Sequence, residues 1–132
     1  MPCESNNLQM RNYILETAIK IDQMQKEAVI QNTCEGCEGS LMSILYNTKP
    51  IIIYLCNGDV LTVRIPETTS TTDLFRIESV RGDSVILRLV VDNEGTLTCT
   101  SYTVVFNLGC ACCLQCLPPI CCERCPRTCE NA

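Results

Sequence analysis

In the first quarter of the chain, apolar residues recur at intervals of three and four. This spacing places them on one face of an α-helix, expected within residues 8–31 after an N-cap at Asn6 or Asn7. So wide an apolar stripe leaves two interpretations open: the helix covers only its own sheet, or it also packs on a neighbouring subunit. The residues of the face are Met10, Ile14, Ala18, Ile21, Met24 and Ala28, with Leu15, Ile19 and Val29 widening it.

After position 50 the pattern changes to the alternation of apolar and polar residues that is typical of β-strands. Asn57-Gly58-Asp59 separates the first two runs and predicts a hairpin turn. Arg81-Gly82-Asp83 separates the next two, and we interpret it as a turn and not as an adhesive motif. The predicted strands are 51–56, 60–65, 74–80, 84–91 and 97–108. In the second of these, the inward-facing residues are expected to be Leu61, Val63 and Ile65.

This order of elements predicts an α+β, mostly β protein with an antiparallel, sandwich-like β domain. The chain has 132 residues, 46% of them hydrophobic, which suffices for one core without support from disulfides. We divide it into an N-terminal helix at 1–32, a β domain at 33–109 and a cysteine-rich tail at 110–132. The tail is expected to be an addition to a domain that is already complete.

Cysteine content determines which chemistry the chain can perform. It has 13 cysteines and no histidine, and eight of the cysteines lie in the last 23 residues. A nucleophilic cysteine needs a neighbouring base or cation to hold it as a thiolate, and the usual base is missing. The motif Cys34-x-x-Cys37 follows a helix and adjoins glycines, unlike a thioredoxin-type redox pair. We therefore expect no enzyme activity and no cofactor, with zinc as the alternative.

The charge pattern and the N-terminal residues limit the possible partners and compartments. A net charge of −5, scattered along the chain, provides no basic patch for nucleic acid or for an anionic membrane. The start of the chain shows no signal peptide, and no stretch has the roughly 18 apolar residues of a membrane span. The protein is thus expected to be made in a reducing cytoplasm, where a cysteine-rich chain either binds metal or awaits later oxidation.

Zinc binding is one interpretation of the cysteines. Four pairs have the two-residue spacing of a zinc knuckle: Cys34/Cys37, Cys110/Cys113, Cys113/Cys116 and Cys122/Cys125. However, the first pair is remote from the tail, the tail pairs overlap, and a dense cluster produces such spacings by chance.

Disulfide formation, within the chain or between chains, is the other interpretation. An odd number of cysteines cannot pair completely within a monomer, and the doublets Cys112-Cys113 and Cys121-Cys122 offer sulfur in two directions. Cys56 and Cys99, inside the strand patterns, suit buried free thiols. Covalent joining of one subunit to several others is favoured. The candidates are Cys3, Cys34, Cys37, Cys110, Cys112, Cys113, Cys116, Cys121, Cys122, Cys125 and Cys129.

Several segments resemble the CotY/CotZ/ExsY family of spore coat and exosporium proteins. The most specific are Phe75-Arg76-Ile77-Glu78-Ser79-Val80 and the ending Gln115-Cys116-Leu117. The resemblance departs from the family at both ends, because the Cys/His-rich N-terminal arm is reduced to Met1-Pro2-Cys3 and residues 117–132 extend the usual ending. The other matching segments are Thr33 to Cys37, Asn47 to Pro50, Val85 to Leu89 and Cys110 to Leu117.

This resemblance implies a structural protein without an active site. Members of the family assemble into ordered two-dimensional, disulfide-stabilised layers of the spore's outer shell. The expected partners are therefore other copies of the chain, in a ring-based array, and other coat proteins. The resemblance also implies synthesis in the mother-cell cytoplasm, deposition on the forespore as coat or exosporium, and oxidation after the mother cell lyses.

Overall fold

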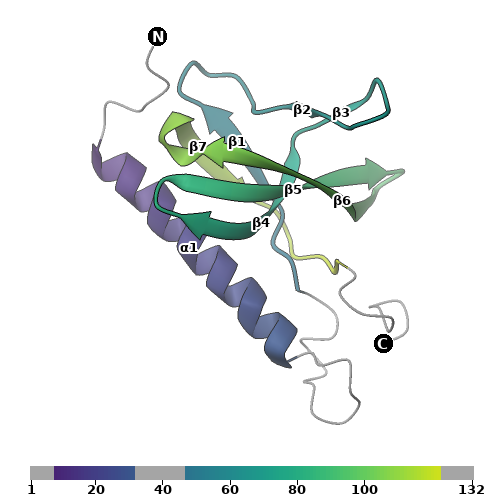
Figure 1. Ribbon diagram of the computed structural model, residues 1–132, viewed down its shortest axis with the longest axis horizontal. Helices are drawn as coiled ribbons and strands as arrows, with labels where there is room; N and C mark the ends of the chain where they lie inside the picture. Colours follow the sequence, from purple (N-terminus) through teal and green to yellow (C-terminus); the bar gives the residue numbers. More distant parts are fainter. Residues whose placement is uncertain (1–7, 32–46, 123–132) are drawn as a thin grey trace.

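The computed structural model describes residues 8–31 and 47–122. One long helix is followed by antiparallel strands, which confirms the predicted α+β, mostly β fold class (Figure 1). Within these ranges no helix combines the length and apolar character needed to cross a membrane. The elements are α1 Leu8–Gln31, β1 Ile51–Leu55, β2 Val63–Arg64, β3 Thr71–Thr72, β4 Leu74–Arg81, β5 Ser84–Asn93, β6 Thr96–Asn107, the 3-10 helix η2 Leu108–Cys110 and β7 Ala111–Cys116.

Five strands form one curled antiparallel sheet in the order β6-β5-β4-β1-β7. In a flat sheet the two outer strands would lie roughly 19 Å apart, at about 4.8 Å per neighbour. Yet the end of β6 and the start of β7 are joined by η2 alone, which at about 2 Å per residue bridges less than half of that distance. The sheet therefore curls until its two edges approach each other at η2.

The inner face of the curled sheet carries the hydrophobic core. Strand pairing aligns its residues across the sheet, with Ile51 opposite Phe75 and Phe75 opposite Leu89. This is the arrangement that the alternation in the sequence predicts. The sheet residues that are almost completely buried here are Ile51, Ile53, Phe75, Ile77, Val85, Leu87 and Leu89.

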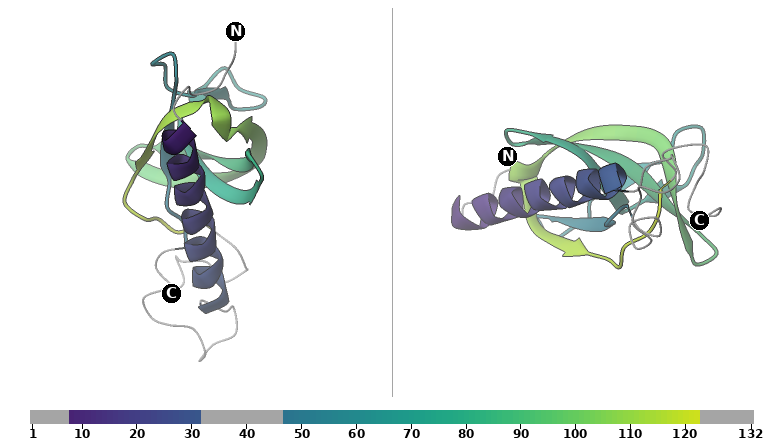
Figure 2. Two further views of the ribbon diagram at one scale, coloured as in Figure 1. Left: turned by 90° about the vertical axis from the view of Figure 1, so that its left-hand side faces the viewer. Right: turned by 90° about the horizontal axis from the view of Figure 1, so that it is seen from below.

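Helix α1 covers the core from the side of β4, η2 and β7 (Figure 2). The predicted helix is confirmed, and Ile14, Ala18 and Ile21 are buried as expected. The predicted face is wrong at two positions, because Met10 and Met24 are 44% and 51% exposed. The side chains of Ala28 and Val29 and the N-cap candidates lie outside the described part of the chain.

Gln25 takes the buried place next to Met24 because it satisfies two backbone groups. Its amide nitrogen donates to the carbonyl of Ile77 at 2.7 Å, and its amide oxygen accepts from the backbone N–H of Lys49 at 3.0 Å. The register of β4 against β5 shifts between Ile77 and Ser79, which disrupts the ladder locally. The side chain of Gln25 in α1 thus takes the place of a strand partner at the carbonyl of Ile77.

The turn predicted at Arg81-Gly82-Asp83 joins paired strands as expected, and a further turn joins β5 to β6. Arg81-Gly82-Asp83 connects β4 to β5, and Glu94 and Gly95, both with positive φ, connect β5 to β6. The hairpin predicted around Asn57-Gly58-Asp59 forms only at its base, where Tyr54 and Val60 make a single bridge. Beyond that bridge β2 pairs with β3 in a separate two-stranded ribbon.

Strand β7 lies beyond the predicted end of the β domain. It pairs with β1 from Ile51 opposite Cys116 to Leu55 opposite Ala111, and Ala111 is completely buried. The chain then continues to Cys122 alongside residues 47–50. This corrects the predicted boundary at Gly109: the first part of the cysteine-rich tail belongs to the sheet.

Candidate cross-linking site

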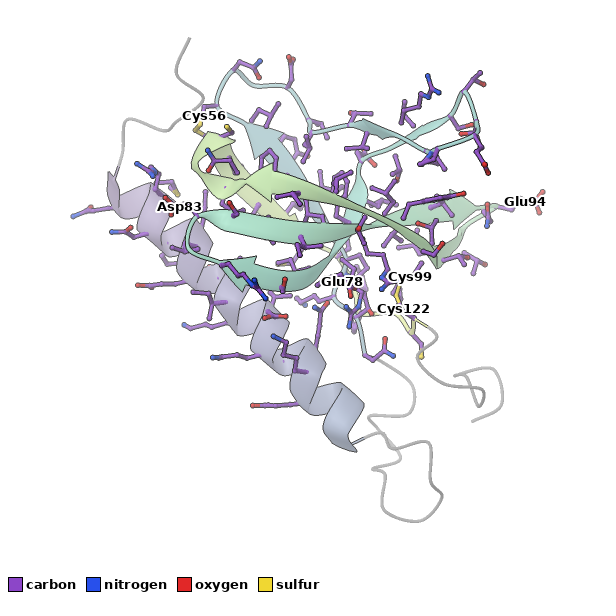
Figure 3. All side chains as sticks on the ribbon, viewed as in Figure 1. Cys56, Glu78, Asp83, Glu94, Cys99 and Cys122 are labelled. Atoms are coloured by element: carbon purple, nitrogen blue, oxygen red, sulfur yellow. A yellow bond between two sulfur atoms is a disulfide. The ribbon has the colours of Figure 1, made fainter. Side chains whose placement is uncertain are left out.

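Two disulfides attach the C-terminal part of the chain to the rest of the sheet. Cys56, directly after β1, is bonded to Cys112 in β7, with 4.8 Å between their Cα atoms. Cys99 in β6 is bonded to Cys122, with 5.5 Å between their Cα atoms. Both Cα separations are usual for disulfides. Figure 3 shows Cys56 at one end of the sheet and the Cys99–Cys122 pair at the other.

Strand register explains how Cys112 reaches Cys56. Tyr54 lies opposite Cys113 but Leu55 lies opposite Ala111, which leaves Cys112 as the extra residue of a β-bulge. A bulge turns its side chain away from the regular alternation. Of the two adjacent cysteines, Cys112 is bonded within the chain and Cys113 is free and exposed.

The Cys99–Cys122 disulfide fastens together two parts of the sheet that are not neighbours. Cys99 lies opposite Val90 near the start of β6, an edge strand. Cys122 follows a segment that pairs with residues 47–50, just before β1. Whereas η2 joins the two edges at one end of the curled sheet, this disulfide ties β6 to the β1 side at the other end.

A charged cluster around the buried Arg76 lies beside the Cys99–Cys122 disulfide. Arg76 is 2% exposed and donates from Nε to the hydroxyl of Thr48 at 2.7 Å. Its Nη1 contacts Glu78, which also accepts from Nε of Arg88 at 2.9 Å. Burial raises the pKa of Glu78, but the hydrogen bond from Arg88 and the charge of Arg76 outweigh burial and lower the pKa below its ordinary value of 4.5. Each charge has a partner, so the cluster is structural.

Cys113 and Cys116 carry exposed free thiols. Both lie on β7, which pairs with β1 on one side and forms an edge of the sheet. Cys113 is opposite Tyr54 and Cys116 is opposite Ile51 in an uninterrupted stretch of the ladder. Because side chains alternate along a strand, residues three apart point to opposite faces. The two thiols are thus available in two different directions.

This geometry disfavours zinc binding by the tail pairs. Cys113 and Cys116 on opposite faces cannot ligate the same ion. Cys110 and Cys122 are already disulfide-bonded, which removes one ligand from each of the pairs Cys110/Cys113 and Cys122/Cys125. Among the residues that the structure describes, no group of three or more histidine, cysteine, aspartate or glutamate residues is arranged to hold a metal.

The structure distributes the predicted cross-linking candidates among three groups. Cys112 and Cys122 are bonded within the chain to Cys56 and Cys99, which corrects the interpretation of those two partners as buried free thiols. Cys110 and Cys121 are also engaged in disulfides. Cys113 and Cys116 are free. The candidates outside the described residues are Cys3, Cys34, Cys37, Cys125 and Cys129.

Comparisons with known proteins identify no relative: no protein-family model, no curated protein and no solved structure matches the chain. The function must therefore be inferred from the residues themselves and from their arrangement on the sheet.

Proposed function

We propose that the protein is a structural subunit of the outer layers of a bacterial endospore, in the coat or the exosporium. Copies of the chain associate with one another in an ordered, ring-based array and with other coat proteins, and disulfides between chains then make the array permanent. Two kinds of support exist: the resemblance of several segments to the CotY/CotZ/ExsY family, and the free thiols of Cys113 and Cys116 on an edge strand.

The positions of these two thiols are the observation that carries the proposal. A subunit with a single exposed thiol forms at most a covalent dimer, whereas thiols on opposite faces of one strand can join a subunit to two neighbours. Each interchain bond forms from two thiols, which lose two protons and two electrons to an oxidant such as molecular oxygen. The chain therefore supports an extended covalent network.

Non-covalent association comes first in this proposal, because thiols in a reducing cytoplasm cannot direct assembly. The exposed side of α1 offers apolar contacts: Met10, Tyr13 and Met24 fall on one stripe, and Tyr13 is 69% exposed. The edge strands β6 and β7 offer backbone groups for pairing. These exposed groups favour the interpretation in which α1 packs on a neighbouring subunit as well as on its own sheet.

A purely structural role also agrees with the chemistry of the described residues. Arg76 and Arg88 are both paired with Glu78. The chain has no histidine to activate a thiol. We accordingly propose no enzymatic activity and no cofactor.

Gel electrophoresis combined with electron microscopy tests this proposal. Protein purified in strong reductant is expected to form ordered particles, and after oxidation in air these should run in detergent as a ladder of oligomers that collapses to monomer on reduction. Zinc content is measured on the same sample. Monomeric bands after oxidation, together with one or more zinc ions per chain, would instead indicate a zinc-binding adaptor. Particles that require oxidation to form would refute the proposed order of events.

A further inference from the structure

The segment 117–122, here called the C-terminal arm, is held almost entirely through its backbone. Leu117 N–H donates to the carbonyl of Pro50 at 2.9 Å, and Ile120 N–H donates to the carbonyl of Thr48 at 2.8 Å. The carbonyl of Ile120 accepts from the N–H groups of residues 47 and 48, each at 3.1 Å. These bonds extend the pairing of β1 and β7 past the end of both strands.

The side chain of Asn47 clamps the last residue of the arm. Its amide nitrogen donates to the carbonyl of Cys122 at 2.6 Å, and its amide oxygen accepts from the N–H of Cys122 at 2.8 Å. Asn47 itself is 4% exposed. These two hydrogen bonds hold Cys122 in the position where its sulfur is bonded to the sulfur of Cys99 in β6.

Two prolines separate Leu117, which is anchored directly after β7, from the rest of the arm. Pro118 and Pro119 are exposed, and neither has an N–H group to donate to a strand. The ladder of β7 ends before them at Cys116, and the single bridge of Thr48 to Ile120 comes after them. The link between Leu117 and Ile120 therefore contributes little to holding the arm.

The acceptor of residues 120–122 consists of Asn47, Thr48 and Cys99, which come from the entry to β1 and from β6. None of these residues belongs to β7, which carries the arm. The arm of a second copy could make the same hydrogen bonds and the same disulfide without any new interface, which is the condition for exchange of a terminal element between subunits.

We propose that in the assembled form the C-terminal arm docks on the acceptor of a neighbouring copy, and that Cys122 of one subunit is then bonded to Cys99 of the next. This inference rests on the proposed self-assembly. Before oxidation the arm is tied by these hydrogen bonds and by the burial of Cys122, without a covalent bond, and it can open locally. Within an assembled particle the neighbour's acceptor is present at a high effective concentration.

Oxidation then traps the exchanged arm. The thiols of Cys99 and Cys122 form one disulfide and lose two protons and two electrons to molecular oxygen. Because every subunit gives one arm and accepts one, exchange produces a reciprocal pair, a ring or an open chain. The Cys99–Cys122 bond between subunits adds to the covalent links that Cys113 and Cys116 form.

Isotope mixing tests the exchange on the full-length chain carrying Cys113→Ser and Cys116→Ser, because the interchain bonds proposed for those two thiols would otherwise join labelled and unlabelled peptides at both pairs. Equal amounts of ¹⁵N-labelled and unlabelled chains are mixed as reduced monomers, assembled, oxidised in air and quenched at acidic pH with a thiol-blocking reagent. Chymotrypsin cleaves after Tyr102 and Phe106 and so separates Cys99 from Cys122, and cleavage after Leu114 separates the control cysteines from the arm. Mass spectrometry then scores the linked peptides as uniform or mixed.

Exchange predicts that about half of the Cys99–Cys122 peptides join a labelled to an unlabelled chain, because neighbours are drawn at random. The Cys56–Cys112 pair is the internal control and should stay unmixed, since it lies within the ladder of β1 and β7. Unmixed Cys99–Cys122 peptides from assembled particles refute the exchange and leave self-assembly standing. If no particles form, both proposals fail. Mixing at both pairs overturns the arm exchange in favour of scrambling or exchange of all of β7.

Discussion

Ending the chain at Gly109 is expected to unfold the protein, because it removes β7 from the sheet. Strand β7 pairs with β1 at five positions, and Ala111 is completely buried. On the other side of that pairing, Ile51 and Ile53 of β1 are also fully buried. The truncation would expose part of both side chains and leave β1 with a single paired position, to β4.

The size of the loss follows from these contacts. About four ladder hydrogen bonds, at a net value of about 1 kcal/mol each, contribute roughly 4 kcal/mol. Partial exposure of Ile51 and Ile53, together with the lost burial of Ala111 and Leu114, adds about 2 to 3 kcal/mol. A typical domain has roughly 5–15 kcal/mol of stability in all, so a loss of about 6 to 7 kcal/mol leaves little or no folded protein.

Urea denaturation followed by circular dichroism in strong reductant measures this effect without a contribution from disulfides. The matched control ends at Cys122 and keeps β7 and the C-terminal arm, and it should unfold cooperatively like the full-length chain. If the chain ending at Gly109 also shows a cooperative transition at a similar urea concentration, β7 is dispensable and our description of the sheet is wrong.

Three further predictions concern the other end of the sheet. Arg76→Ala should lower the free energy of unfolding, measured in urea, by about 3 kcal/mol, because it breaks a buried ion pair whose remaining carboxylate keeps one other partner; a loss under about 1 kcal/mol would contradict the buried network. Because the pKa of Glu78 is lowered in the folded protein, the ionised side chain contributes fully to stability above pH 4.5, and this contribution disappears as the pH falls through the lowered pKa. Glu78→Gln should therefore flatten the acid dependence of the free energy of unfolding. An unchanged pH dependence would show that Glu78 does not make this contribution. In the oxidised monomer, Cys99→Ser and Cys122→Ser should each cost about 3 kcal/mol, with no additional loss in the double variant and no effect in reductant; additive losses would show that the two cysteines are not paired.

Local patterns were sufficient to predict the elements near the start and centre of the fold. The spacing of Ile14, Ala18 and Ile21 predicted α1 with its bounds, and alternation predicted β4, β5 and β6. The exposure of Met24 and the burial of Gln25 could not be predicted, because they depend on a bulge in β4 that is far away in sequence. The apolar pattern predicts which elements form but not which backbone groups in them need a partner.

The role of β7 and the pairing of the cysteines depend on contacts across the whole chain. The run Ala111-Cys112-Cys113-Leu114 is short and rich in cysteine, and Gly109 before it suggests an end to the domain. Its identity as a strand comes from pairing with β1, which is about sixty residues earlier. Similarly, Cys56 meets Cys112 only because β1 pairs with β7, and Cys99 meets Cys122 only because the sheet curls; the sequence contains no local signal for either. An apolar run after the last predicted strand was the one available hint.

The central claim is that Cys113 and Cys116 join neighbouring subunits, and blocking of free thiols on intact oxidised particles tests it most directly. Particles are treated with a maleimide, denatured and reduced, and the cysteines released by reduction are labelled with a second, heavier maleimide for peptide mass spectrometry. We predict that Cys113 and Cys116 carry mainly the heavy label. We also predict that Cys99→Ser particles keep high oligomers on non-reducing gels, and that adding Cys113→Ser and Cys116→Ser to this variant removes most of them. Complete labelling of both thiols by the first maleimide, in particles that still resist detergent, would contradict the claim.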